Sequence, residues 1–274
     1  MITLNGRDYK LLLLDTNILI EIIRNQNNEL KNFWRWYNSE RYIICFSIFT
    51  ILELKKSSSV YQQFLDLFSI IPCAILKSHE QLLADEVNVY PLRDEINPIL
   101  VAAPGRTISK NSIKDVLDLA FSNKQISSDE NRWNSAREEI VNGIVSLVRN
   151  FPPKNKKYSK KEIREFIQLA GFQQIALRQM KFAKSIVDSN KAVEIDAFPS
   201  IKMTTFVVFY KFYVDQRKHL VSDAFDILIF SVLPYVDTII TESHFANTIK
   251  KIKSQDKFIK HVDTYTIKHL RNLT

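Results

Sequence analysis

Short apolar runs that end at a polar residue constrain the fold of this chain more than any other feature. The run over 10–14 (KLLLL) stops at Asp15, as a buried parallel strand does. The run over 42–46 (YIICF) reads as a second buried strand, and 70–76 (IIPCAIL) is a third candidate that Pro72 weakens. Helical segments follow these runs. Because strands alternate with helices, we predict an α/β domain with a parallel central sheet.

The helical segments are marked by caps and by apolar periodicity. Asp15 begins a segment whose apolar residues share one helical face: Ile18, Leu19, Ile22 and Ile23. Ser47 caps a short helix that reaches about Lys56, and another helix covers about 60–68. Near the end of the chain the alternation returns as helix, strand, helix and short strand: 221–233, 236–241, 243–251 and about 259–264.

Between Ser78 and Pro199 the pattern changes, and we predict no strand there. Helical periodicity covers three segments separated by polar stretches at 122–132 and 152–159: 113–122, 134–149 and 160–188. Periodicity does not decide whether the aromatic segment 204–214 is a helix or a strand, and a helix is favoured. We therefore predict one domain, with a core formed by 1–77 and 200–274 and a helical insertion or subdomain over 78–199.

Composition limits the kinds of phosphate site that the chain can build. The four glycines (Gly6, Gly105, Gly143 and Gly171) are far apart, which excludes a Walker loop and a dinucleotide fingerprint, since both need clustered glycines. If the protein handles phosphates, it must therefore do so through metal ions or through Lys and Arg side chains. The formal net charge of +8 favours polyanionic partners, nucleic acid first, without proving one.

The cysteines and the apolar runs indicate where the protein works. The two cysteines, Cys45 and Cys73, lie in apolar runs and are too few for a structural zinc site or a disulfide framework. The apolar run Leu11–Leu14 is too short for a signal peptide, and no stretch approaches the roughly 18 apolar residues of a membrane span. We expect a cytoplasmic protein with reduced thiols and no membrane partner.

Acidic residues stand where strands end and helices begin. Asp15 follows the first strand, at the edge of an open α/β sheet where ligands bind, although helix capping is an alternative role. Glu53 lies among apolar neighbours in SIFTILELKK, where a carboxylate is costly to bury unless paired or metal-bound; its alternative is a solvent-facing position. Asp223 and Asp226 share a helical face, and their alternative is stabilisation of the helix start.

Two further acids flank the strand TIIT, since Asp237 precedes it and Glu242 follows Thr241 at its end. Carboxylates that converge from strand ends and helix starts form an all-oxygen pocket, which suits Mg²⁺ or Mn²⁺ rather than zinc or copper. With nucleic acid as substrate, such a metal would activate water and neutralise charge on the phosphate. The five histidines show no paired metal spacing. The carboxylates are therefore the predicted metal ligands.

Three ordered blocks of the sequence resemble the PIN family of nucleases: LLLLDTNILIEII, FSIFTILEL and DAFDILIFSVLPYVDTIITESHF. They are similar to the family's opening strand and helix, to its serine followed by a helix with a glutamate, and to its aspartate-led helix and following strand. The resemblance covers roughly 1–76 and 203–265, but not the insertion. It implies a PIN-like, Rossmann-like α/β fold and a metal-dependent endoribonuclease of toxin or defence-effector type.

The resemblance implies catalytic roles for the acids. Asp15, Glu53 and Asp226 match the acidic metal ligands of the family. Asp237 matches an acid that some relatives carry just before the last core strand. Glu242 stands where many members have Asp or Asn, which is a departure from the family pattern.

Other residues of the same blocks would support these ligands. Thr16, Asn17 and Thr241 would orient the ligands or the phosphate, and Asp223 is an extra acid that can also serve the metal. The long insertion has no counterpart in the resemblance. It can select the substrate, form a homo-oligomer or bind an inhibitory protein, and its residues do not choose among these.

The densest basic stretch is KNKKYSKKEIR over 154–164, and a second lies at 250–260. As a nucleic-acid surface, the first stretch would contact phosphates through five lysines: Lys154, Lys156, Lys157, Lys160 and Lys161. Tyr158 within it would stack on a base. The alternative is an ordinary solvated surface.

Four functions remain open. The favoured one is an RNA endonuclease that acts on tRNA, rRNA or mRNA. The second is a related structure-specific DNA nuclease of the flap-endonuclease class, with the insertion as an arch over a DNA end. The third is a non-catalytic PIN module that binds RNA or a protein, against which the retained acids argue. An aspartyl phosphatase is less favoured, because Asn17 replaces its usual second Asp.

Overall fold

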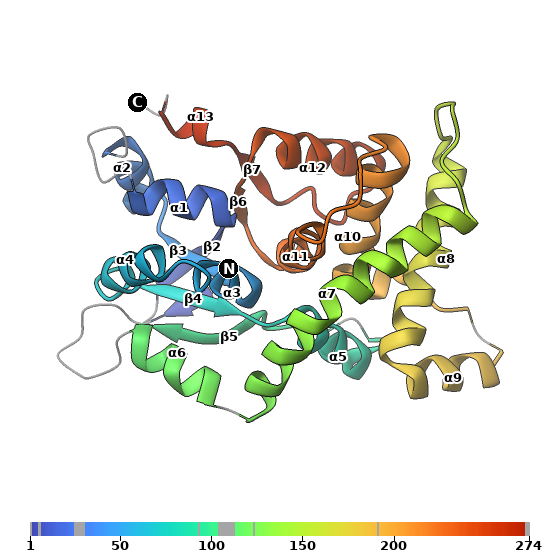
Figure 1. Cartoon of the computed structure of the whole chain (residues 1–274), viewed down its shortest axis with the longest axis horizontal. Helices are drawn as coiled ribbons and strands as arrows, with labels where there is room; N and C mark the ends of the chain where they lie inside the picture. The colour runs from blue at the N-terminus through green and yellow to red at the C-terminus, as the bar shows by residue number, and fades with distance from the viewer. Residues whose placement is uncertain are drawn as a thin grey trace.

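The computed structural model describes residues 2–4, 7–24, 31–92, 94–103, 113–122, 124–190 and 192–271. A mixed, mostly parallel sheet at its centre has the strand order β5-β4-β3-β2-β6-β7 (Figure 1). The strands are β1 (Ile2–Leu4), β2 (Arg7–Leu14), β3 (Tyr42–Ser47), β4 (Cys73–Leu76), β5 (Ile99–Ala103), β6 (Thr238–Ile240) and β7 (Asp263–Tyr265). Strands β2, β3, β4, β6 and β7 are parallel, whereas β5 is antiparallel to β4 and β1 to β2.

Helices cover both faces of the sheet (Figure 1). They are α1 (Thr16–Arg24), α2 (Lys31–Ser39), α3 (Ile48–Leu54), α4 (Ser58–Phe68), α5 (His79–Val89), α6 (Ile113–Ser122), α7 (Lys124–Asn150), α8 (Lys160–Arg178), α9 (Met180–Asp188), α10 (Pro199–Val208), α11 (Asp223–Ile229), α12 (Ser243–Gln255) and α13 (Ile267–Arg271). This α/β arrangement is compatible with a Rossmann-like fold. None of the helices that the structure describes is both long and apolar enough to cross a membrane.

The central strands are continuous apolar runs because both of their faces are covered. Leu11 and Leu13 of β2 pack into one core cluster with α5, α8, α10 and α12. Leu12 and Leu14 point to the opposite face and pack with α1, α3 and α4. The prediction of buried strands at 10–14 and 42–46 is confirmed.

The prediction that 78–199 contains no strand is wrong. Strand β5 lies in this segment and pairs antiparallel with β4 at the edge of the sheet, so the sheet is mixed rather than purely parallel. Most of its side chains are only partly buried, because an edge strand is covered less than a central one. The segment shares the main core, since Ile163, Ile167 and Ile175 of α8 belong to the same cluster as Leu11.

The helix boundaries in this segment also differ from the prediction. Helix α7 begins at Lys124, inside the polar stretch that we expected to separate two helices. The helix expected over 160–188 is two helices, α8 and α9, with a break at Gln179. Helices α2 and α5 and strand β1 were not predicted. Helix boundaries are set by packing that a sequence pattern does not contain.

The aromatic segment 204–214 is helical, as favoured. Helix α10 continues directly into a π-helical turn, Phe209–Val214. Nearly every side chain from Pro199 to Tyr213 is buried, so the segment has no polar face and its periodicity is weak. A π-helical turn is rare and is often found at functional sites. It carries Lys211, whose side chain is buried.

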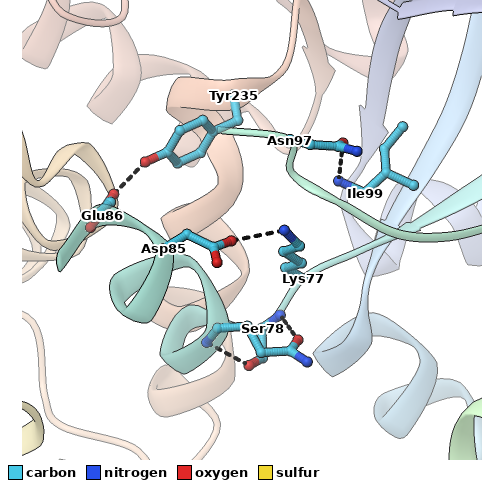
Figure 2. Close-up of polar contacts among 8 residues, drawn as sticks. Lys77, Ser78, Asp85, Glu86, Asn97, Ile99 and Tyr235 are labelled. Carbon is cyan, nitrogen blue, oxygen red and sulfur yellow. Dashed lines mark hydrogen bonds and ion pairs between the residues drawn. The ribbon is translucent and has the colours of Figure 1, made fainter. Parts of the chain in front are cut away.

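A buried glutamate of α5, Glu86, bonds to α10. Figure 2 shows its second contact, with Tyr235. The carboxylate of Glu86 accepts hydrogen bonds from the backbone N–H and the hydroxyl of Ser200, both at 2.7 Å, and from the hydroxyl of Tyr235. Burial raises the pKa of Glu86 to about 7. Next to it, Lys77 and Asp85 form an ion pair at 2.8 Å.

The Glu86→Gln variant is expected to be more stable than the wild type at pH 8, by on the order of 3 kcal/mol. Folding raises the pKa of Glu86 from 4.5 to about 7, so its ionisation destabilises the fold as pH rises through this window. Glutamine fits the site, because its Nε2 can donate to the Ser200 hydroxyl while its Oε1 still accepts from Tyr235. Urea denaturation at pH 4 and pH 8 tests this. Equal differences between variant and wild type at both pH values would contradict it.

Candidate active site

The pairing of β2 with β6 brings Asp15 beside Thr241. Leu14 is in register with Ile240, so both strands end at one edge of the sheet, the carboxyl edge. The Thr241 hydroxyl donates to Asp15 Oδ2 at 2.6 Å, and the Asp15 backbone carbonyl accepts from the Leu19 N–H at 2.9 Å. The backbone of Asp15 therefore starts α1, whereas its carboxylate faces the end of β6.

Glu53 reaches the same edge through α3. Ser47, the last residue of β3, caps this helix by accepting the Phe49 N–H, as predicted. One turn later Glu53 is partly buried rather than solvent-facing, and its Oε2 accepts a hydrogen bond from the Thr16 hydroxyl at 2.6 Å. Thr16 therefore holds Glu53 beside the start of α1.

Asp223 and Asp226 of α11 share a lysine rather than capping their helix. Lys211 Nζ lies 2.6 Å from Asp223 Oδ1 and 3.1 Å from Asp226 Oδ2. The Lys211 and Asp223 side chains are 3% and 6% exposed, so this is a buried ion pair. The second Asp223 oxygen accepts the Leu220 N–H at 2.8 Å. The π-helical turn thus places a cation inside the acidic site.

Glu242 completes the group. It precedes α12, but its carboxylate does not cap that helix and instead accepts from Asn17 Nδ2 at 2.8 Å. Both side chains are exposed, so they form the outer rim of the site. We call Asp15, Glu53, Asp223, Asp226 and Glu242 the acidic cluster.

The raised pKa values of Asp15, Glu53 and Asp226 show that the carboxylates of the site repel one another. The pKa of Asp15 is raised to about 6, mainly by burial and further by the negative charges of Asp226 and Glu242. Burial also raises the pKa of Glu53 and of Asp226, and the charge of Asp226 adds to the effect at Glu53. Mutual repulsion of this kind is relieved by a cation.

The donor set fits a hard divalent cation, because it consists of carboxylate oxygens. Among the described residues, however, no three His, Cys, Asp or Glu side chains stand ready to hold one ion together. Each ligand candidate is instead engaged by a neighbouring donor: Asp15 by Thr241, Glu53 by Thr16 and Asp226 by Lys211. A metal would bind only after these carboxylates turn toward it.

Asp237 is not part of the acidic cluster. It precedes β6, where its Oδ2 accepts the N–H of Leu11 at 2.8 Å. Leu11 lies four residues before Asp15, which is about 13 Å along a strand. A residue before a parallel strand lies at the opposite edge from one after it, and this places Asp237 away from the other predicted ligands. It lines a separate pocket there, together with His261.

The basic stretch over 154–164 is only partly available to a ligand. Lys154 forms an ion pair with Glu162, and Lys161 lies 3.8 Å from Glu165. Lys156, Lys157 and Lys160 are also exposed. Tyr158 packs its ring against Phe209, with centroids 5.0 Å apart, so it serves the core and is not presented for base stacking.

Sequence reasoning missed Lys211. A signal existed, since it is the only charged residue in the run TTFVVFYKFYV. A charged residue inside a continuous apolar segment is rarely buried unless it is paired. The missing information was which carboxylates, later in the chain, would face it.

The chain matches no protein-family model, and neither curated proteins nor solved structures give a match. The chemistry of the site is therefore inferred from the residues of this chain.

Proposed function

We propose that this protein is a Mg²⁺- or Mn²⁺-dependent endoribonuclease with a PIN-like fold. One observation carries the proposal. Acids from the three sequence blocks that resemble the PIN family gather at the carboxyl edge, where burial and their mutual repulsion raise the pKa of Asp15, Glu53 and Asp226. Several buried carboxylates around a single lysine are unfavourable for stability alone, whereas they suit the binding of a further cation.

In this proposal Asp15, Glu53, Asp226 and Glu242 hold the metal. When bound, the metal activates a water molecule and neutralises charge on the scissile phosphate. Thr241 and Thr16 fix the directions of Asp15 and Glu53 through their hydroxyl groups. Lys211 compensates the charge of Asp223 and Asp226, so that several acids can stay ionised in one buried site.

Cleavage of RNA is expected to require a divalent cation. Purified protein is incubated with total RNA and with single-stranded RNA and DNA oligonucleotides of one sequence, in Mg²⁺, in EDTA, and after Mn²⁺ is added back. We expect internal cuts in RNA with Mg²⁺, none in EDTA, and recovery with Mn²⁺, because carboxylate oxygens bind both cations.

Three outcomes of this experiment would count against the proposal. Cleavage that persists in EDTA would assign the carboxylates a structural role. Cleavage of DNA but not of RNA would favour the DNA nuclease. Tight RNA binding without any cleavage, in either metal, would favour a non-catalytic module.

A further inference from the structure

Two cations meet on one aromatic ring beside the acidic cluster. The guanidinium carbon of Arg137, from α7, lies 3.6 Å from the ring centroid of Phe225. Lys56 Nζ, just after α3, lies 5.4 Å from the same centroid. Phe225 is fully buried and immediately precedes Asp226 on α11. The ring thus holds a cation from the 78–199 segment next to a proposed metal ligand.

Neither cation has an anionic partner. Within the described part of the chain, the side chains of Arg137 and Lys56 make no hydrogen bond or ion pair, and the buried Nε of Arg137 has no acceptor. The negative charge of Glu53 attracts both Arg137 and Lys56, but its Oε2 accepts a hydrogen bond from Thr16 and does not pair with either of them. An arginine that served only to join α7 to the core would be expected to pair with that carboxylate.

The two cations also repel each other. The pKa of Lys56 is lowered, first by burial and then by the charge of Arg137. Like charges at close range are unfavourable unless an anion lies between them. Stacking on Phe225 occupies the face of the guanidinium and leaves the N–H groups at its edge free to donate. This geometry suits a phosphate, which a guanidinium binds through two parallel hydrogen bonds.

We propose that Arg137 and Lys56 bind a backbone phosphate of the nucleic acid beside the acidic cluster. The inference rests on the proposed nuclease function and deepens it, because it gives the 78–199 segment a role in substrate binding. The planar guanidinium of Arg137 would orient the nucleic-acid strand. The exposed Lys56 would add positive charge beside the acidic cluster.

The test measures RNA binding in EDTA, so that cleavage does not interfere. A labelled single-stranded RNA is titrated with the wild type, with the Arg137→Gln/Lys56→Gln double variant, and with Lys181→Gln/Lys184→Gln. The last is a matched control, since it removes two positive charges from exposed positions on α9. We expect the first double variant to weaken binding at least about tenfold. The slope of log K against log salt should fall in magnitude by about 0.7, as the loss of one neutralised phosphate on a single strand predicts.

Two single variants keep the test decisive if the double variant folds poorly. Lys56→Gln alone changes an exposed residue and should weaken binding, while most of the slope is retained because Arg137 still neutralises the same phosphate. Arg137→Lys keeps the positive charge but loses the planar guanidinium and its paired N–H donors. The salt slope should therefore be retained, while the affinity for RNA falls. Thermal denaturation checks that each variant is folded.

The outcomes separate this inference from the proposed function. If the double variant binds RNA like the control variant, or if the wild type binds no RNA, the phosphate site is overturned. If wild-type protein binds RNA but never cleaves it, and the double variant shows weaker binding with a smaller salt slope, the phosphate site stands without the nuclease. If wild-type protein cleaves RNA and the double variant binds normally, the nuclease stands without the phosphate site.

Discussion

The Asp15→Asn variant is expected to cleave RNA about a thousandfold more slowly than the wild type. A metal contributes several kcal/mol to stabilisation of the transition state, and each 1.4 kcal/mol is a factor of ten in rate. Asparagine keeps the shape of the side chain and can still accept from the Thr241 hydroxyl. It removes the negative charge that the cation needs at the centre of the site. The measurement is the initial rate of RNA cleavage at saturating Mg²⁺.

The same substitution should not weaken the fold. The pKa of Asp15 rises from 3.8 to about 6 on folding, so its ionisation destabilises the protein as pH increases from about 4 to about 6. Above pH 7 the charge-free variant should be more stable in EDTA by on the order of 3 kcal/mol, and below pH 4 this gain should vanish. Denaturation in urea at both pH values measures the difference.

Asp237→Asn provides a matched control, because it makes the same chemical change at the opposite edge of the sheet. Asp237 accepts the N–H of Leu11 and lies away from the acidic cluster. We expect folded Asp237→Asn protein to cleave RNA at nearly the wild-type rate. Normal cleavage by Asp15→Asn, or an equal loss in the two variants, would contradict the placement of the active site.

The contrast between Asp15 and Asp237 shows how far the sequence could predict the site. The position of Asp15 at the end of a central strand is confirmed, because it directly follows a continuous apolar run and the end of such a strand is a local feature. Its role as a metal ligand stays a prediction. The apolar run of β6 marks its neighbours Asp237 and Glu242 equally as acids next to a strand. Only the direction of the strand in the sheet separates them, since one precedes the strand and the other follows it.

Strand β5 and the burial of Lys211 could not be predicted from the sequence, because both depend on contacts with residues far away in the chain. The five residues of β5 follow several polar ones, and their pairing with β4, from which α5 separates them in the chain, decides their structure. Lys211 is buried because Asp223 and Asp226, more than ten residues later, neutralise it. Local patterns predicted β2, β3 and α3 well, since their burial and capping are determined by adjacent residues.

The Lys211→Met variant is expected to lose about 3–5 kcal/mol of stability in EDTA. Methionine has a similar length and suits a buried position, but it leaves Asp223 buried without its cation. If a divalent cation binds the acidic cluster, it can replace the missing charge. The stability of the variant should then recover with Mg²⁺ or Mn²⁺. The cation should raise the melting temperature of the variant more than that of the wild type, because in the wild type Lys211 competes with the cation for Asp226.

The chain offers a matched control in Lys202, the other lysine whose side chain is shown buried between two carboxylates. Its Nζ lies 2.7 Å from Asp196 and 2.6 Å from Asp256, and its side chain is 6% exposed. Lys202→Met should be destabilised to a smaller extent, because Asp196 and Asp256 are more exposed than Asp223 and can be solvated after the lysine is removed. Since Asp196 and Asp256 are not in the acidic cluster, Mg²⁺ should not rescue it beyond the wild-type response. Equal Mg²⁺-induced shifts in both variants and the wild type would place the cation elsewhere and remove the main support for a metal-dependent nuclease.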